Sequence, residues 1–194
     1  IFNRSIILVA AGHASGYALK LAQDSHGIVS ILFLVAPTWQ GPLRAMGLPD
    51  GVRNGVKNLV RLPLLGQTLY YLNTTPSFLR LMYKRHVYVD ETKLTPEFIA
   101  QKQQITSKNG ARYAPAAFVT GAIDPVTKRE EFLQLLSSIS IPVIIILAEN
   151  APPKSKAEME AMGREQVGGV RLPGTLGIYE EYPQAVTEAI QHFI

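Results

Sequence analysis

The sequence predicts an α/β fold in which a parallel sheet is interrupted by a helical insertion. Continuous apolar runs such as 28–37 and 142–148 alternate with helical patterns. Unbroken hydrophobicity is typical of strands that helices cover on both faces. Residues 38–121 instead form a series of helical patterns separated by Pro and Gly. Because strand and helix alternate again after this segment, the pattern favours an open, right-handedly wound sheet with a helical cap.

The elements are expected in the following order. Residues 5–11 form a buried strand, 12–16 a turn of small residues and then a helix to about Asp24, and 29–36 a second strand. Within the insertion, helices are predicted over 51–62, 64–72, 76–86, 96–106 and 114–120. After it we expect a helix over 128–136, a strand over 142–148, a helix over 154–164, a strand over 169–172 and a final amphipathic helix over 182–193.

This order divides the chain into two parts. Residues 1–37 and 122–194 are predicted to form the sheet core, and residues 38–121 the helical cap. Four strands are few for a sheet of this kind, and the first strand has an apolar edge where another strand ought to pair. We therefore expect further strands that precede Ile1 and lie outside this sequence.

Composition limits the class of protein. The chain has 194 residues, of which 47% are hydrophobic and 18% charged, as in an ordinary globular domain. No apolar run reaches the roughly 20 residues that cross a bilayer, and no secretory signal is visible. The absence of cysteine excludes disulfides, thiolate metal sites and a cysteine nucleophile. The four histidines, His13, His26, His86 and His192, are too scattered to predict a metal site, and no cofactor is expected.

The formal charge of +4 is unevenly distributed. Residues 40–112 contain eleven Lys or Arg against four Asp or Glu, whereas residues 113–194 contain six against ten. A basic segment of this kind attracts acidic protein surfaces, anionic lipid or nucleic acid over long range, or it is simply a solvated helical face. Nucleic acid is not expected, because the nearby aromatic residues fit packing within the cap better than a stacking platform. The predicted docking surface consists of Arg53, Lys57, Arg61, Arg80, Lys84 and Arg85.

The turn Gly12-His13-Ala14-Ser15-Gly16 connects the first strand to the first helix. A strand that leads into Gly-x-x-x-Gly and then a helix is the setting of a nucleophile elbow, whose middle residue sits on a strained turn above the sheet. Here the middle residue is Ala14, and a methyl group cannot attack a carbonyl. A degenerate dinucleotide loop is the alternative, but the third glycine and the acidic residue at the end of the next strand are both absent.

This turn, the next strand, the helical insertion and the two later strand ends resemble the α/β-hydrolase superfamily over the whole chain. The resemblance implies a catalytic acid in the turn after 143–147, where this chain has Ala151, and a catalytic histidine within 174–183, where it has Leu176. Three coincident losses remove nucleophile, acid and base together. The resemblance therefore implies a triad-deficient member that hydrolyses nothing.

Four stretches, VAAGHASGY, VAPTWQGPL, YKRHVYVD and LPGTLGIYEEYP, are similar to a cyanobacterial and plastid group within that superfamily. The similarity implies a photosynthetic source and a soluble or membrane-peripheral protein of the plastid or the cyanobacterial cytoplasm. Some triad-deficient members of the superfamily act as ligand receptors or protein-interaction modules. We therefore expect a binding or scaffolding subunit that docks on a protein partner or a membrane-peripheral complex through its basic cap.

Other functions remain open from the residues. They are a weak esterase that uses Ser15, a lyase-like activity without a covalent intermediate, and a receptor for a small apolar ligand. The residual pocket is expected to include His13, Ser15 and Asn150, and the Ser15 N–H at a helix start is suited to an anionic or carbonyl group. Against catalysis, Ser15 lies one place past the middle of the turn, where a serine is ordinarily a helix cap.

Overall fold

The computed structural model describes residues 5–24, 27–165 and 168–194, so His26 lies outside the described residues. The chain falls into two compact units. The sheet unit runs over Ile1–Trp39, His86–Val89 and Pro125–Ile194, and the helical unit over Gln40–Arg85 and Asp90–Asp124.

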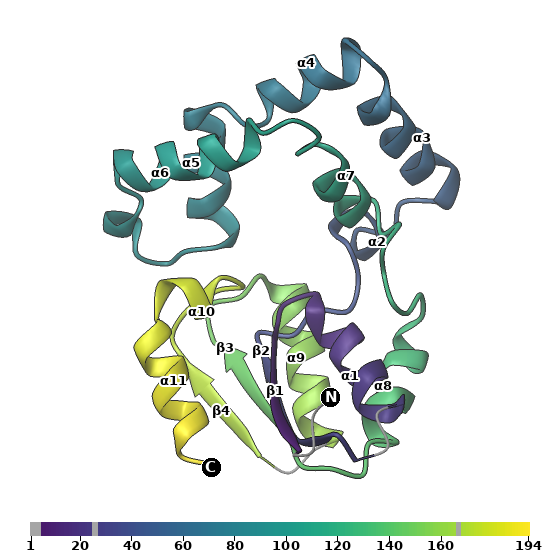
Figure 1. Cartoon of the computed structure of the whole chain (residues 1–194), viewed down its shortest axis with the longest axis vertical. Helices are drawn as coiled ribbons and strands as arrows, with labels where there is room; N and C mark the ends of the chain where they lie inside the picture. The colour runs from purple at the N-terminus through teal and green to yellow at the C-terminus, as the bar shows by residue number, and fades with distance from the viewer. Residues whose placement is uncertain (1–4, 25–26, 166–167) are drawn as a thin grey trace. The chain divides into compact units, whose positions relative to one another are not determined.

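The sheet unit contains a parallel sheet whose strands follow one another in the order β1-β2-β3-β4 (Figure 1). These strands are β1 (Ile6–Ala11), β2 (Val29–Val35), β3 (Val143–Ala148) and β4 (Gly169–Leu172). All three strand pairs are parallel, which confirms the direction predicted from the unbroken apolar runs. Every residue of β3 is buried, because this strand lies inside the sheet and is covered on both faces.

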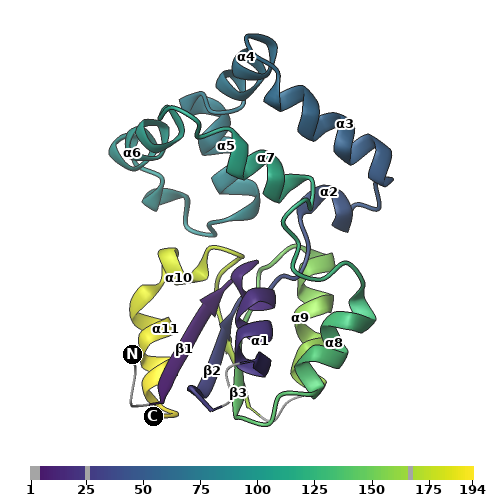
Figure 2. The ribbon, with the colours of Figure 1, turned by 45° about the vertical axis from the view of Figure 1, so that its right-hand side comes forward.

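Helices cover the two faces of this sheet. One layer consists of α1 (Ala14–Asp24), α8 (Arg129–Ser137) and α9 (Pro153–Glu165), in which α8 contacts both α1 and α9. After β4 come the short α10 (Ile178–Glu181) and then α11 (Pro183–Gln191). Figure 2 shows α11 on the face opposite α1, α8 and α9, which gives the three-layer order expected of an α/β sheet.

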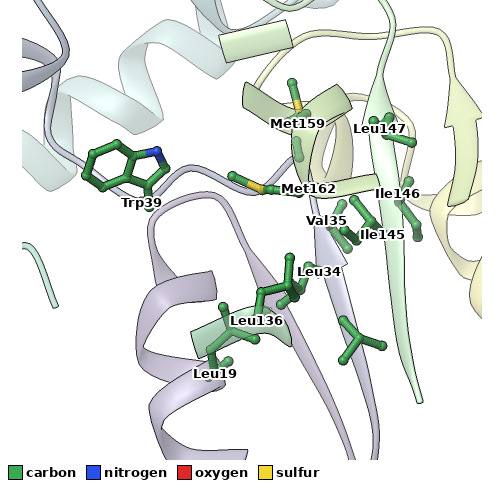
Figure 3. Close-up of a cluster of buried hydrophobic side chains, with 14 of the residues drawn as sticks. Leu19, Leu34, Val35, Trp39, Leu136, Ile145, Ile146, Leu147, Met159 and Met162 are labelled. Carbon is green, nitrogen blue, oxygen red and sulfur yellow. The ribbon is translucent and has the colours of Figure 1, made fainter. Parts of the chain in front are cut away.

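The main core lies between the sheet and the layer of α1, α8 and α9. Figure 3 shows its side chains projecting from β2 and β3 toward these helices, and Leu19, Leu34 and Met162 are fully buried. Burying a side chain of this size contributes roughly 1.5–3 kcal/mol. Phe33, which is also fully buried, contacts Phe193 with 6.3 Å between the ring centroids.

Strand β1 stands at one end of the strand order and is less covered than its neighbours. Ile7 and Val9 are 43% and 48% exposed, whereas Ala10 is buried. Strand side chains alternate between faces, so Ile7 and Val9 share one face of β1. The expectation of further strands upstream of Ile1 stays a prediction.

The helical unit consists of short helices and contains no strand within its described residues. Its elements are α2 (Pro42–Ala45), α3 (Asp50–Arg61), α4 (Leu65–Leu72), α5 (Pro76–His86), the 3₁₀ turn η1 (Glu91–Lys93), α6 (Pro96–Thr106) and α7 (Tyr113–Val119). Thr95 caps α6, since its hydroxyl accepts the N–H of Phe98 at 3.2 Å. No helix in the described part of the chain is long and apolar enough to cross a membrane.

Two contacts hold the helical unit together near its ends. The carboxylate of Asp124 accepts the Gly41 N–H at 2.9 Å and the Arg44 Nε–H at 2.7 Å, which joins the first and last residues of the unit. Helix α3 contacts both α4 and α7. Gly66 lets α4 approach α3 closely, because a Cβ at this position would stand 2.2 Å from the carbonyl oxygen of Val60.

Candidate functional site

The loops that follow the four strands form the candidate site. All four strands are parallel, so their carboxyl ends meet at one edge of the sheet. The turn after β1 leads into α1, which begins at Ala14, and the loops after β3 and β4 carry Ala151 and Leu176. The structure therefore brings the three sequence-predicted positions to the same edge of the sheet.

The turn between β1 and α1 has its unusual backbone at Gly12, where φ is +54°. The Gly12 N–H donates to Val35 O at 2.9 Å, and Gly12 O accepts the N–H groups of Ser15 and Thr38 at 3.2 and 3.1 Å. Ala14 is already the first residue of α1. The expectation that Ala14 stands at the strained middle of the turn therefore needs correction, because the positive φ falls two residues earlier.

Space around Gly12 is open. Among the described residues, no atom beyond the chain neighbours of Gly12 would lie within 4 Å of a Cβ built there. Gly16 differs, because a Cβ at Gly16 would stand 2.4 Å from Cγ of Pro125. A side chain at position 12 would thus point into open space, whereas glycine at position 16 is required by packing. The sequence does indicate the position of this turn, because Gly12 is the first glycine after the first apolar run.

The turn after β3 carries no acidic side chain at the predicted position. Ala151 is 6% exposed and belongs to the hydrophobic core. Asn150 links the ends of β3 and β4, because its N–H donates to Gly174 O at 2.9 Å and its Oδ1 accepts the Gly174 N–H at 3.2 Å. The predicted pocket residue Asn150 therefore holds two loops together at the carboxyl edge.

The loop after β4 places Leu176 against the hydrophobic core, where it is partly buried. The residues on either side of it bind the short segment His86–Val89. The Thr175 hydroxyl and the Gly177 N–H both donate to Val87 O, the second at 3.2 Å. A Cβ at Gly177 would stand 2.4 Å from Cγ1 of Val87. No pattern in the sequence signalled that this segment contacts the loop.

Of the remaining predicted pocket residues, Ser15 lies in the first turn of α1 and His13 lies just before this helix. Ser15 is fully buried, and its Oγ has no hydrogen-bond partner among the described residues. A hydroxyl that is closed off from solvent cannot reach a bulky ester, and a nucleophile needs a base within hydrogen-bond distance. His13 is half-buried and lies edge-on to Tyr17, with 5.9 Å between the ring centroids.

Metal binding has no support at this edge. Within the described ranges of the chain, no group of three or more His, Asp or Glu side chains is placed to hold a metal ion.

The predicted docking surface of the helical unit is not a single exposed face. Arg53 is only 5% exposed, and its guanidinium donates to Thr120 O at 2.7 Å and to Leu48 O at 3.0 Å and pairs with Asp50. The assignment of Arg53 to a docking surface is therefore wrong. Its side chain ties α3 to the end of α7, and a charge used in this way is not available to a partner.

The other basic residues of the predicted surface are more accessible. Arg61 and Arg85 are exposed, and Lys57 is partly exposed and donates to Asn54 Oδ1 at 3.1 Å. Arg80 is exposed but donates to Leu94 O, and Lys84 pairs with Glu91 at 2.8 Å. Exposed ion pairs of this kind contribute little to stability.

Comparison with solved structures identifies the fold. No protein-family model and no curated protein matches the sequence. Solved structures that match over almost the whole chain are α/β-hydrolase-fold proteins. The chain therefore has the α/β-hydrolase fold.

Three of these structures illustrate the likeness. A thermophilic esterase from Thermogutta terrifontis matches 98% of this chain with 20% identity and a TM-score of 0.68. An enol-lactonase from Burkholderia xenovorans matches 97% with 11% identity and a TM-score of 0.67. An α/β hydrolase from Nostoc sp. PCC 7120 matches 98% with 21% identity and a TM-score of 0.66. The chain spans 64%, 65% and 66% of the lengths of these three proteins, and identities this low show the fold alone.

Proposed function

We propose that this protein is a catalytically inactive member of the α/β-hydrolase fold and that it acts by binding. One observation supports this most directly. The loops at the carboxyl edge of the sheet offer no nucleophile, carboxylate or imidazole at the positions where the resemblance implies a triad. Ala14 or Gly12, Ala151 and Leu176 stand there instead. Without a base and its orienting acid even a displaced hydroxyl stays a weak nucleophile.

Within this proposal, Gly12 is the position equivalent to the nucleophile. Its φ of +54° and the open space in front of its missing Cβ are the properties that a nucleophile elbow requires. Ala14 has neither the positive φ nor a place outside the helix. Either assignment leaves the turn without a reactive side chain.

The rival function is hydrolysis of an ester through Ser15. The likeness of the fold to that of an esterase and an enol-lactonase supports this alternative. The burial of Ser15 argues against it. A receptor for a small apolar ligand is a further alternative, in which Ala14, Ala151 and Leu176 would line an apolar site.

The proposal is tested by turnover of p-nitrophenyl acetate and butyrate by the full-length protein. We expect no hydrolysis above the buffer rate. Two triple variants, each with Ala151→Asp and Leu176→His, then ask which position replaces the nucleophile. Gly12→Ser should give measurable turnover in this background, and Ala14→Ser should not, because its hydroxyl would start inside the helix.

Turnover by the unmodified protein that disappears in Ser15→Ala would overturn the proposal and establish a serine hydrolase. Turnover only in the Ala14→Ser triple variant would restore Ala14 as the nucleophile-equivalent position.

The binding role is assigned to the helical unit. Its residues 40–85 and 90–124 contain eleven Lys or Arg and five Asp or Glu, a net charge of +6. Arg53 is excluded because it is buried. The proposed docking residues are therefore Lys57, Arg61, Arg80, Lys84 and Arg85. The partner is a protein or a membrane-peripheral assembly, and the plastid or cyanobacterial location rests only on the sequence resemblance.

A further inference from the structure

The connection between α3 and α4 exposes a run of apolar side chains. Leu62, Leu64 and Leu65 are 47%, 85% and 51% exposed, and Pro63 between them is exposed as well. Single exposed leucines are ordinary on protein surfaces, but a contiguous apolar group marks an interaction site. The four residues 62–65 are called the leucine tip below.

The backbone of the leucine tip is strained at its most exposed residue. Leu64 has φ +59° and ψ −70°, and the Leu65 N–H donates to Pro63 O at 2.7 Å. This is a γ-turn with positive φ, which is rare and strained. Leu64 is also the N-cap of α4 and forms no side-chain cap bond, at a position where Ser, Thr, Asp, Asn or Gly is preferred.

The fold gives no compensation for this strain. Ala36 and Leu64 are the non-glycine residues with positive φ among those described. Ala36 is fully buried, and its N–H donates to Ile146 O at 2.8 Å, so packing and a hydrogen bond hold it in place. Leu64 directs its side chain into solvent instead. Strain that surrounding contacts do not require points to a functional reason for the residue.

Helix α3 continues the apolar surface toward the leucine tip. Val52, Val56 and Leu59 are spaced i, i+4 and i+7 and share one face of the helix, and Val52 and Leu59 are 50% and 38% exposed. Lys57 and Arg61 lie on the neighbouring strip of the same helix. An apolar face bordered by basic side chains is typical of helices that lie in a membrane interface.

Charge selects between the candidate partners. Residues 50–72, which cover α3, the leucine tip and α4, contain three basic residues and one acidic residue. Arg53 is buried and pairs with Asp50, so the charges left for a partner are those of Lys57 and Arg61. An anionic bilayer surface attracts such a segment, and long apolar side chains that protrude can enter the acyl boundary without a matching pocket. A protein partner would instead need a cavity shaped for these leucines.

We propose that the hairpin of α3 and α4 docks on an anionic lipid surface. The leucine tip enters the boundary between headgroups and acyl chains, while Lys57 and Arg61 contact the lipid phosphates. This inference rests on the proposed binding role of the helical unit and names its partner. It does not depend on the absence of catalysis.

The test is flotation of the full-length protein with vesicles of phosphatidylcholine alone or with 30% phosphatidylserine. We expect binding only to the anionic vesicles, and weaker binding as NaCl is raised. Leu64→Asn should lower the partition constant about tenfold, the effect expected for losing one inserted leucine. Arg61→Glu should lower it about tenfold as well, through lost attraction and added repulsion.

Matched controls lie in the sheet unit. Leu21→Asn removes a leucine of α1 that is 52% exposed, and Lys20→Glu makes the same change in net charge as Arg61→Glu. Neither should change binding. Leu64→Asn should also keep or raise the melting temperature, because asparagine is favoured at an N-cap, whereas leucine forms no cap bond there. A merely structural role for Leu64 predicts the opposite shift in melting temperature.

Three results would overturn the inference. The first is equal partition to neutral and anionic vesicles, and the second is partition that Leu64→Asn leaves unchanged. The third is that the protein does not bind vesicles but forms a concentration-dependent dimer in gel filtration, which Leu64→Asn dissociates. The last result would assign the leucine tip to a second copy of the chain. None of them alters the outcome of the ester assay, so the failure of this inference and that of the proposed loss of catalysis are distinguishable.

Discussion

The two most informative turns of this chain are the one at Gly12, in the sheet unit, and the one at Leu64, in the helical unit. Both have positive φ, +54° and +59°. Glycine adopts this conformation without a steric penalty, whereas leucine does not. The Gly12 turn therefore has an unstrained backbone and no side chain. The Leu64 turn retains an unfavourable residue and exposes it.

The two turns differ in whether the surrounding fold favours the residue that stands there. The Gly12 turn is held by backbone hydrogen bonds of Gly12, Ser15 and Thr38 at the carboxyl edge of the sheet, and its positive φ favours glycine there. Glycine at position 64 would form the same turn with less strain. The comparison thus supports the proposed binding role of the helical unit.

The largest expected change in stability comes from a substitution in the packing of α4 against α3, next to the leucine tip. Gly66→Ala should destabilise the helical unit by about 3 kcal/mol, because the new methyl group would overlap the backbone at Val60 rather than a flexible side chain. Chemical denaturation measures this change. Vesicle binding should fall with it, since the tip loses its fixed geometry.

Gly55→Ala is the matched control for this substitution. Gly55 lies inside α3, and among the described residues no atom would lie within 4 Å of its Cβ. The change should stabilise the protein by about 0.5–1 kcal/mol through helix propensity. If both alanines had the same effect, the close approach of α4 to α3 at Gly66 would be contradicted.

The second prediction compares a buried basic residue, Arg53, with an exposed one, Arg61. Arg53→Met should cost about 2–3 kcal/mol, because it leaves the carbonyls of Thr120 and Leu48 without this buried donor. Arg61→Met should be nearly neutral in stability and should weaken vesicle binding. Thermal unfolding measures the stability of both variants and flotation measures their vesicle binding. If Arg53→Met left the stability unchanged, Arg53 would again be a candidate for the docking surface.

The smallest expected effects have opposite signs at the two turns. Gly12→Ala should destabilise by about 1 kcal/mol, since alanine has a penalty at positive φ. Leu64→Gly should stabilise by about the same amount, through relief of strain and a better N-cap. Urea denaturation resolves a difference of this size. Two changes of the same sign would show that the backbone at one of these turns has been misassigned.

Local sequence patterns predicted most elements of the fold. The apolar runs of β2 and β3 predicted two buried strands, and the parallel direction followed from their lack of alternation. Strands β1 and β4 were also predicted, but they are only partly buried. Helices such as α5 and α6 begin at the predicted residues because Pro76 and Pro96 are restricted to the first turn of a helix. The elements that sequence analysis missed, α2, η1 and α10, have four residues or fewer and depend on tertiary contacts.

The candidate site was less predictable for reasons that are physical. Periodicity placed Arg53 on a helix face with Lys57 and Arg61, but it could not show that α7 covers part of that face. The pattern Gly-x-x-x-Gly did not show where β1 ends, so the strained backbone was expected at Ala14, whereas the positive φ lies at Gly12. The strain at Leu64 has no sequence signal, because leucine is ordinary beside a proline.

The measurement that tests the central claim most directly is the intact mass of the full-length protein before and after treatment with a fluorophosphonate probe, which forms a covalent adduct with activated serines. We predict no adduct under conditions in which an active serine esterase is fully labelled. An adduct that maps to Ser15 and is absent from Ser15→Ala would contradict the account, because it would show an activated nucleophile at a hydroxyl that the structure buries.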